Sequence, residues 1–341
     1  MLGCHFAAPP WACEIAAAGG EGGPLRAELG ARSCRGSVPI TLAAMTPGLC
    51  LMTVHAHPDD ESSKGAGTVA LYHRQGIRTV LVCCTGGEAG DVLNPAMDRP
   101  DVRGRLPEIR REELAEAARI IGYDEIVSLG YRDSGMPGSS ANDRPDCFAR
   151  APLDEAVGRL VAAMRRERPH VVVAYPEDQS GYPHPDHIRA HEVAVAAFDA
   201  CGDPAAFPDA GPPWQPAKLY YTRFSARRVR ALHEEFAARR MESPFTDEWL
   251  ARFPLADPAT AVVDISAVAG VPFDALLAHA TQVDPQSPFW FGLPRDVLER
   301  LHPYDEYVLA RPAVAPDDVA CDDVEADLFA GLRSPSNIPD A

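Results

Sequence analysis

The chain has 341 residues, of which 46% are hydrophobic and 24% are charged, enough for one large core or for two domains. Its formal net charge of −17 disfavours binding to nucleic acid, because phosphate recognition needs basic patches. The nine cysteines are odd in number, scattered and without a CxxC pair, so neither a disulfide framework nor a cysteine zinc site is expected. No apolar run reaches the roughly 20 residues that span a bilayer, and the N-terminus lacks a secretory-signal pattern, so we expect a cytoplasmic protein that engages no membrane.

The ends of the chain differ in composition from its middle. Residues 1–44 are rich in glycine, alanine and proline, and their apolar residues follow no sustained period. We therefore expect a disordered N-terminal extension over 1–44 and a folded domain over 45–311. Residues 312–341 are acidic and proline-rich, and we expect them to form an irregular tail.

Apolar strands alternate with helical patterns along the first half of the domain. We expect strands at 49–56, 77–85, 125–130 and 170–175, and helices at 61–76, 106–122, 153–169 and 187–202. This alternation predicts an α/β fold, a Rossmann-like, mostly parallel sheet with helices on both faces. After the core at 48–202 the pattern loosens into a C-terminal α/β elaboration over 203–311, with strands expected at 216–224 and 259–266 and helices at 225–240 and 267–282.

Ionisable residues gather just after the first and the fourth predicted strands. His57 and Asp60 are three residues apart after the first strand, and His184 and His187 have the same spacing after the fourth. Ligands of open parallel sheets bind at the carboxyl ends of the strands, where these two loops are expected to lie. A His/Asp/His set with an open position is a common donor set for a catalytic divalent metal, most often zinc. Two polar surface loops are the alternative, but matching motifs at two strand ends favour the metal site.

Other catalytic signatures are weak or misplaced. The stretch GAGTVA (65–70) fits a dinucleotide-binding pattern, but it lies inside a predicted helix and not at the strand–helix turn. The loop TGGEAGD (85–91) lacks the Lys-Ser/Thr of a phosphate-binding loop, and no GxSxG motif follows a strand. A dinucleotide-dependent oxidoreductase and a serine hydrolase are therefore disfavoured.

The motifs AHPDDE (56–61) and HPDH (184–187) resemble the paired motifs of the LmbE-like zinc N-acetylglucosaminyl deacetylases, and the resemblance covers most of residues 45–311. Within that family, VHAHPDDESSKGA (54–66) and LNPAMDRPDV (93–102) are similar to the mycothiol S-conjugate amidases. The resemblance implies an LmbE-like fold, one Zn²⁺ per chain (Fe²⁺ being possible) and a small-molecule thiol-conjugate substrate. The implied detoxification reaction cleaves mycothiol S-conjugates to glucosaminyl-inositol and an S-substituted N-acetylcysteine; the oligomeric state stays open.

The same resemblance implies roles for individual residues. His57, Asp60 and His187 would bind the metal, and Asp59 would be the general base. An imidazolium at His184 would stabilise or protonate the tetrahedral intermediate. Further roles near the reacting amide are implied for Tyr182 and Asp186, and substrate contacts for Lys64, Arg110, Asp133, His279 and Gln282.

Three alternatives stay open. A deacetylase of N-acetylglucosaminyl-inositol in mycothiol biosynthesis would share the metal motifs, as would an amidase homologue in an antibiotic pathway. A non-catalytic sugar-binding module would not need Asp59 together with all three ligands, so it is disfavoured. Ser180 stands where the amidase pattern has a glycine, which puts substrate choice in question.

Overall fold

The computed structural model describes residues 48–178, 182–251, 259–312 and 324–333. The expected N-terminal extension, Ser180 and most of the expected tail lie outside the described residues. In the described part of the chain, no helix combines the length and apolar character that crossing a membrane requires.

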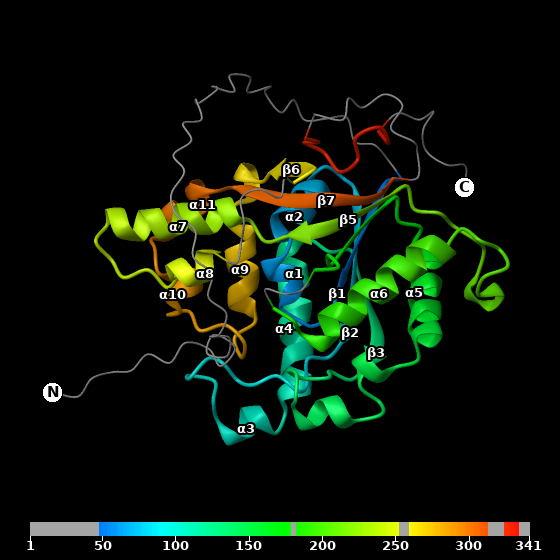
Figure 1. The fold of residues 1–341 in the computed structure, drawn as a ribbon, viewed down its shortest axis with the longest axis horizontal. Coiled ribbons are helices and arrows are strands. Elements are labelled where there is room, and N and C mark those ends of the chain that lie inside the picture. Colours follow the sequence, from blue (N-terminus) through cyan, green and yellow to red (C-terminus); the bar gives the residue numbers. More distant parts are fainter. Residues whose placement is uncertain (1–47, 179–181, 252–258, 313–323, 334–341) are drawn as a thin grey trace, which may run out of the picture. The chain divides into compact units, whose positions relative to one another are not determined.

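Within these described ranges, seven strands form one sheet in the order β3-β2-β1-β4-β5-β7-β6 (Figure 1). They are β1 (Cys50–His55), β2 (Arg78–Thr85), β3 (Glu125–Tyr131), β4 (Val171–Ala174), β5 (Lys218–Arg223), β6 (Ala261–Asp264) and β7 (Tyr304–Pro312). Strands β1 to β5 are parallel to one another, whereas β7 runs antiparallel to both β5 and β6. The prediction of a mostly parallel α/β sheet is confirmed.

Helices cover both faces of this sheet, because alternate residues of its central strands are apolar on each side. Met52 and Val54 of β1 pack against α5 and α6, while Leu49 and Leu51 face the side covered by α2, α4 and α9 (Figure 1). Helices α7, α8, α10 and α11 share a separate apolar cluster with the start of α9. The helices are α1 (Asp60–Ser63), α2 (Ala66–Arg74), α3 (Pro100–Arg103), α4 (Leu106–Ile121), α5 (Leu153–Glu167), α6 (Pro185–Ala200), α7 (Ala226–Ala238), α8 (Asp247–Ala251), α9 (Val271–Ala278), α10 (Pro288–Phe291) and α11 (Arg295–Leu301).

The single helix expected at 61–76 is wrong, because the chain breaks between α1 and α2. Gly65 lies at the break with φ +88, and a Cβ there would sit 2.7 Å from the hydroxyl oxygen of Tyr307 on β7. Similarly, the helix expected at 267–282 is a 3-10 turn at Ser266–Val268 followed by the shorter α9. The loop after α9 is thereby free to turn back towards α4.

The end of the chain contributes to the sheet and to the core. Strand β7 was not predicted, yet it joins β5 to β6 at the edge of the sheet. Residues 324–333 contain no helix and only an isolated bridge, but Leu328 and Phe329 are fully buried beside α2. Glu325 accepts a hydrogen bond from Lys218 Nζ at 2.8 Å, which ties this segment to β5. This part of the expected tail therefore packs on the core of the domain.

Candidate active site

The loops that follow β1 and β4 meet where the order of the parallel strands reverses, which is the usual ligand-binding position in such sheets. His57 and Asp60 come from the first loop, and His187 lies in the first turn of α6. One donor atom from each of these three residues lies within 4.8 Å of the other two. Asp60 Oδ2 is 3.4 Å from His57 Nδ1 and 3.3 Å from His187 Nε2, and all three side chains are buried.

Asp60 is the most firmly held member of this group. The hydroxyl of Tyr175, directly after β4, donates to Asp60 Oδ2 at 2.7 Å and accepts the Ala56 N–H at 2.9 Å. The backbone N–H of His57 donates to the same oxygen at 3.0 Å, and Lys64 Nζ lies 2.5 Å from Asp60 Oδ1. Burial alone would raise the pKa of Asp60, but the Lys64 ammonium and His187 outweigh it and hold that pKa well below its usual range. The carboxylate is therefore ionised and fixed in place.

The donor set fits a divalent cation. Burial lowers the pKa of His187, so its imidazole is neutral and available as a ligand. Burial also disfavours the charged form of His57, but hydrogen bonds to Asp133, Asp186 and Asp60 raise its pKa well above the usual value. Three buried carboxylates around one imidazole are an environment that favours positive charge, which a bound cation would supply.

The other ring nitrogen of His57 faces a second set of carboxylates. His57 Nε2 is 3.1 Å from Asp186 Oδ2 and 3.5 Å from Asp133 Oδ1. Ser134 donates its N–H to Asp186 Oδ2 at 2.8 Å and its hydroxyl to Asp186 Oδ1. These carboxylates and His184 also lie close enough together to hold an ion. However, Asp186 is already satisfied by these hydrogen bonds, so we interpret it as the partner that orients His57 for a metal on Nδ1.

Asp59, which precedes Asp60 in the chain, is held by Arg110. Its φ of 97° places it in the left-handed region, and its N–H donates to Glu61 Oε2 at 2.9 Å. Arg110 Nη2 donates to Asp59 Oδ2 at 2.9 Å and to the Pro58 carbonyl at 2.7 Å, and Nη1 donates to the Gly87 carbonyl. Burial raises the pKa of Asp59, and the guanidinium opposes that shift. Arg110, expected to contact substrate, is thus engaged with the expected base.

His184 and Tyr182 lie beside the histidines of the candidate metal site. The His184 and His57 rings meet edge to face with centroids 4.5 Å apart, and Tyr182 stacks on His184 at 6.0 Å. His184 Nδ1 accepts the Asp186 N–H at 3.2 Å, so a neutral ring carries its proton on Nε2. Burial, reinforced by His57 and His187, lowers the pKa of His184 to about 3. This pKa favours a neutral imidazole at His184 over the expected imidazolium.

The remaining predicted residues lie at different distances from this centre. Lys64 contacts the candidate metal site through its ion pair with Asp60. His279 is fully buried, and its Nε2 lies 2.6 Å from Glu61 Oε1. It therefore contacts the metal loop, the segment after β1 that carries His57 and Asp60, through Glu61. Gln282 donates its side-chain amide to the Asp91 carbonyl at 3.0 Å, in the loop after β2.

Four buried polar residues of the site were not predicted: Tyr175, Glu61, Ser134 and Glu113. Glu113 lies one turn after Arg110 on the buried face of α4. A carboxylate among the apolar residues of that face predicts a buried hydrogen-bonding partner. Glu61 belongs to the quoted motif and could have been singled out in the same way. Nothing local distinguishes Tyr175 or Ser134, because their partners come from distant segments.

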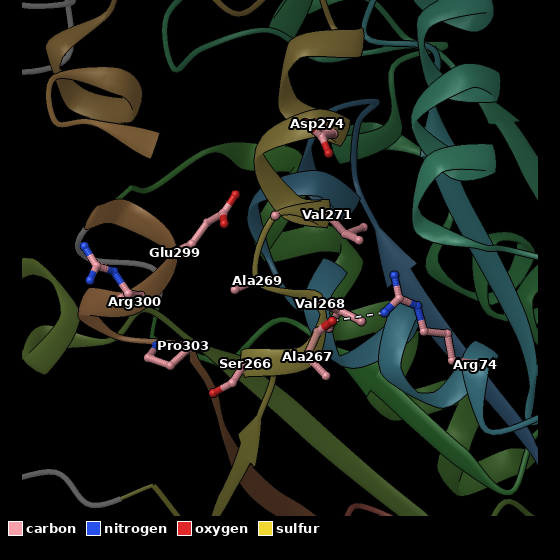
Figure 2. A pocket seen from close by; sticks show the side chains of 11 residues that line it. Arg74, Ser266, Ala267, Val268, Ala269, Val271, Asp274, Glu299, Arg300 and Pro303 are labelled. Carbon is pink, nitrogen blue, oxygen red and sulfur yellow. Dashed lines mark hydrogen bonds between the residues drawn. The ribbon is translucent and has the colours of Figure 1, made fainter. Parts of the chain in front are cut away.

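A separate cavity of about 480 Å³ lies between the end of α2, the start of α9 and α11 (Figure 2). None of the predicted site residues lines it. Arg74 donates to the Ala267 carbonyl at 3.0 Å, and Arg300 pairs with Asp296 at 2.7 Å. Both arginines at this cavity already donate to protein groups, and we assign the cavity no role in the reaction.

Sequence comparisons identify a matching family and relatives that cover most of the chain. The family described as PIG-L, GlcNAc-PI de-N-acetylase, matches residues 52–198. The mycothiol S-conjugate amidase of Streptomyces coelicolor is 40% identical over 302 residues, which cover 85% of this chain and 99% of the relative. The 1D-myo-inositol 2-acetamido-2-deoxy-alpha-D-glucopyranoside deacetylase of Streptomyces avermitilis is 42% identical over 281 residues, or 78% of this chain and 93% of the relative.

Solved structures share the fold at low sequence identity. The N,N'-diacetylchitobiose deacetylase of Pyrococcus horikoshii superposes with a TM-score of 0.52 at 18% identity and covers 82% of this chain and 91% of its own. The 4-carboxy-2-hydroxymuconate hydratase of Pseudomonas putida gives a TM-score of 0.54 at 18% identity, with coverages of 80% and 100%. One fold thus carries two reaction types, so it does not by itself fix the chemistry.

Proposed function

We propose, from the premise that this chain belongs to the PIG-L family of GlcNAc-PI de-N-acetylases, that it cleaves the amide of mycothiol S-conjugates in a zinc-dependent detoxification reaction. The chain is an enzyme, a hydrolase of amide bonds. The products would be glucosaminyl-inositol and an S-substituted N-acetylcysteine. We place the reaction in the cytoplasm, where the five cysteines of the described residues, all buried and free, stay reduced.

The observation that carries the proposal is the convergence of His57, Asp60 and His187, with Asp59 held beside them. His57 Nδ1, an Asp60 carboxylate oxygen and His187 Nε2 would hold the cation, and Asp186 would orient the His57 ring. A zinc ion bound there would polarise the amide carbonyl as a Lewis acid and make water more acidic.

The protein's own groups would then move the protons. Asp59 would accept the proton of the attacking water, a task helped by the raised pKa that burial gives it. His184 would donate its Nε2–H to the oxygen on which negative charge develops. As the C–N bond breaks, Asp59 would return the proton to the leaving nitrogen, so that a carboxylic acid and an amine are released.

Lys64 supports the amidase over the deacetylase. Its ammonium has three N–H donors, of which Asp60 Oδ1 takes one at 2.5 Å and Ser63 Oγ takes another at 3.2 Å. The Lys64 side chain is 30% exposed, so the third donor can meet a carbonyl of the substrate. An S-conjugate has an additional acetamide carbonyl near the scissile amide, whereas the acetyl group of the precursor has none.

The deacetylase remains a second candidate because its Streptomyces avermitilis representative is 42% identical to this chain. The test is to measure the metal content of the purified protein and kcat/KM for a fluorescent mycothiol S-conjugate and for N-acetylglucosaminyl-inositol, side by side. We expect about one divalent ion per chain and a higher kcat/KM for the conjugate. A higher value for the precursor would assign the chain to the biosynthetic step, and no turnover of either substrate by metal-loaded protein would refute both assignments.

A further inference from the structure

We propose that Glu61 and His279 form a positioning pair that holds Asp59 in its left-handed conformation, so that the elaboration after the core completes the catalytic loop. This inference rests on the proposed role of Asp59 as the base. Glu61 and His279 do not contact the donor atoms of the candidate metal ligands. Both side chains are fully buried, so they do not contact the substrate either.

The backbone of Asp59 needs an external hold. Its φ of 97° is unfavourable for a residue with a Cβ, and such conformations persist only where the surroundings fix them. The Asp59 carbonyl accepts the N–H groups of Ser62 and Ser63 at 3.1 and 3.2 Å, which fixes one side of the residue. Its own N–H is fixed by Glu61 Oε2 at 2.9 Å.

Glu61 can do this only while its carboxylate is stabilised. The side chain is fully buried, and a buried carboxylate is costly unless it is paired and hydrogen-bonded. Its other oxygen, Oε1, accepts from the Ser62 hydroxyl at 2.6 Å and lies 2.6 Å from His279 Nε2. Within the described residues, His279 is the ion-pair partner of Glu61.

His279 is itself held by α4. It follows α9 directly, and two residues later the N–H and hydroxyl of Thr281 both donate to the Glu113 carboxylate, at 2.8 and 2.6 Å. Glu113 lies one turn after Arg110, the residue that holds the Asp59 carboxylate. Helix α4 therefore fixes Asp59 in two ways. Arg110 bonds directly to the Asp59 carboxylate. Glu113 holds Thr281, and the nearby His279 holds Glu61, which accepts the backbone N–H of Asp59. Both ends of the proposed base are fixed to the same rigid element.

The alternative is that this buried ion pair only attaches α9 to the metal loop. Breaking it would then lower the stability of the protein without a specific effect on Asp59. The two readings differ in how His279 couples to Asp59. A residue that acts through Asp59 matters only while Asp59 is functional, whereas a general structural defect lowers activity in any background.

The experiment compares kcat, KM, metal content and Tm for the wild type and for the variants H279L, H279Q, D59N and H279L/D59N. His279→Leu removes the donor, and His279→Gln keeps an N–H donor close to the position of Nε2. We expect His279→Leu to lower kcat by about 10- to 100-fold with KM and metal content within about twofold, because small misplacements of a reacting group cost about that much. His279→Gln should restore most of this loss. In the D59N background, His279→Leu should lower kcat by less than about threefold further.

The matched control is His170→Leu, which removes a buried histidine that precedes β4 at the opposite end of the sheet from the site. It should lower Tm and leave kcat near the wild-type value. If H279L fails to fold, Glu61→Gln gives the same test, because a side-chain amide replaces one of the two accepting oxygens by an NH₂ group that only donates.

The outcomes separate the two proposals. Equal losses of kcat from His279→Leu in the wild-type and D59N backgrounds, or no loss in either, would overturn the positioning role while leaving Asp59 as the base. Loss of metal in proportion to activity would also overturn it. A D59N enzyme with nearly full kcat would instead refute the proposed function of Asp59 itself.

Discussion

Replacing Gly87 by alanine is expected to displace Arg110 from Asp59 without changing either residue. Gly87 has φ +67, and a Cβ built there would lie 2.3 Å from Arg110 Cζ and 2.4 Å from Arg110 Nη1. Heavy atoms do not approach so closely, and the guanidinium is buried against the carbonyls of Pro58 and Gly87, so it has to leave its position. The hydrogen bond of 2.9 Å to Asp59 Oδ2 is then lost.

The size of the effect follows from that single contact. A hydrogen bond between charged groups is worth about 1.5–3 kcal/mol, which corresponds to about 10- to 150-fold in kcat. The left-handed backbone adds about 1–2 kcal/mol of lost stability for any residue with a Cβ. Gly138→Ala is the matched control, because Gly138 has φ +80 but no heavy atom within 4 Å of the built Cβ.

The assay is kcat under saturating substrate together with urea unfolding of both variants. Both should lose a similar free energy from the backbone, and Gly87→Ala more if the clash strains the fold. Only Gly87→Ala should lose activity, with metal content retained. If Gly87→Ala keeps kcat within about twofold of Gly138→Ala, the Arg110–Asp59 contact is not needed and the reasoning fails.

Removing the metal with a chelator should abolish turnover, and about one equivalent of a divalent ion should restore it; activity that survives in metal-free protein would contradict the donor assignment. Lys64→Ser should shift the kcat/KM ratio of S-conjugate to precursor towards the precursor by about 10-fold or more, and an unchanged ratio would remove Lys64 as the selector. Burial would raise the pKa of Asp327, but hydrogen bonds from Arg333 and other donors hold it below the ordinary 3.8, so its stabilising contribution is present above that pH and is lost as pH falls through the folded-state pKa. Asp327→Asn should therefore lower the free energy of unfolding at pH 7, and the difference from wild type should shrink as pH falls below 3.8; a pH-independent difference would refute this reasoning. Phe329→Ala should cost about 3–5 kcal/mol in urea unfolding, because Phe329 is fully buried, and a loss below about 1 kcal/mol would show that the segment is not packed in solution.

The strand ends that build the site could be predicted from local sequence. The strands expected at 49–56 and 170–175 are β1 and β4, short apolar runs buried on both faces, and each ends just before its polar loop. Because parallel strands present their carboxyl ends at one edge, the approach of His57 to His187 follows once the strands are placed. The spacing of His57 and Asp60 then puts both donors on the same side of a turn.

What could not be predicted depends on contacts between distant segments. The break at Gly65 exists because Tyr307, on a strand near the end of the chain, occupies the space beside it. The contact between Arg110 and Asp59 depends on the backbone of the loop after β2 and on the left-handed φ of Asp59, neither of which has a local pattern. Strand β7 is different, since YDEYVLARP is rich in strand-forming residues and carries a local signal for a strand.

The position of His279 has a consequence for the order of events during synthesis. Glu61 and its partner are 218 residues apart, so the metal loop leaves the ribosome long before the imidazole that neutralises it. Strands β1 to β4 can pair in that interval, but Glu61 stays hydrated and Asp59 is free to relax to an unstrained backbone. We expect a nascent chain to acquire its sheet early and its activity late, when α9 docks. A fragment that ends before His279 would lack the ion-pair partner of Glu61 as well as β7, and we expect it to be catalytically silent.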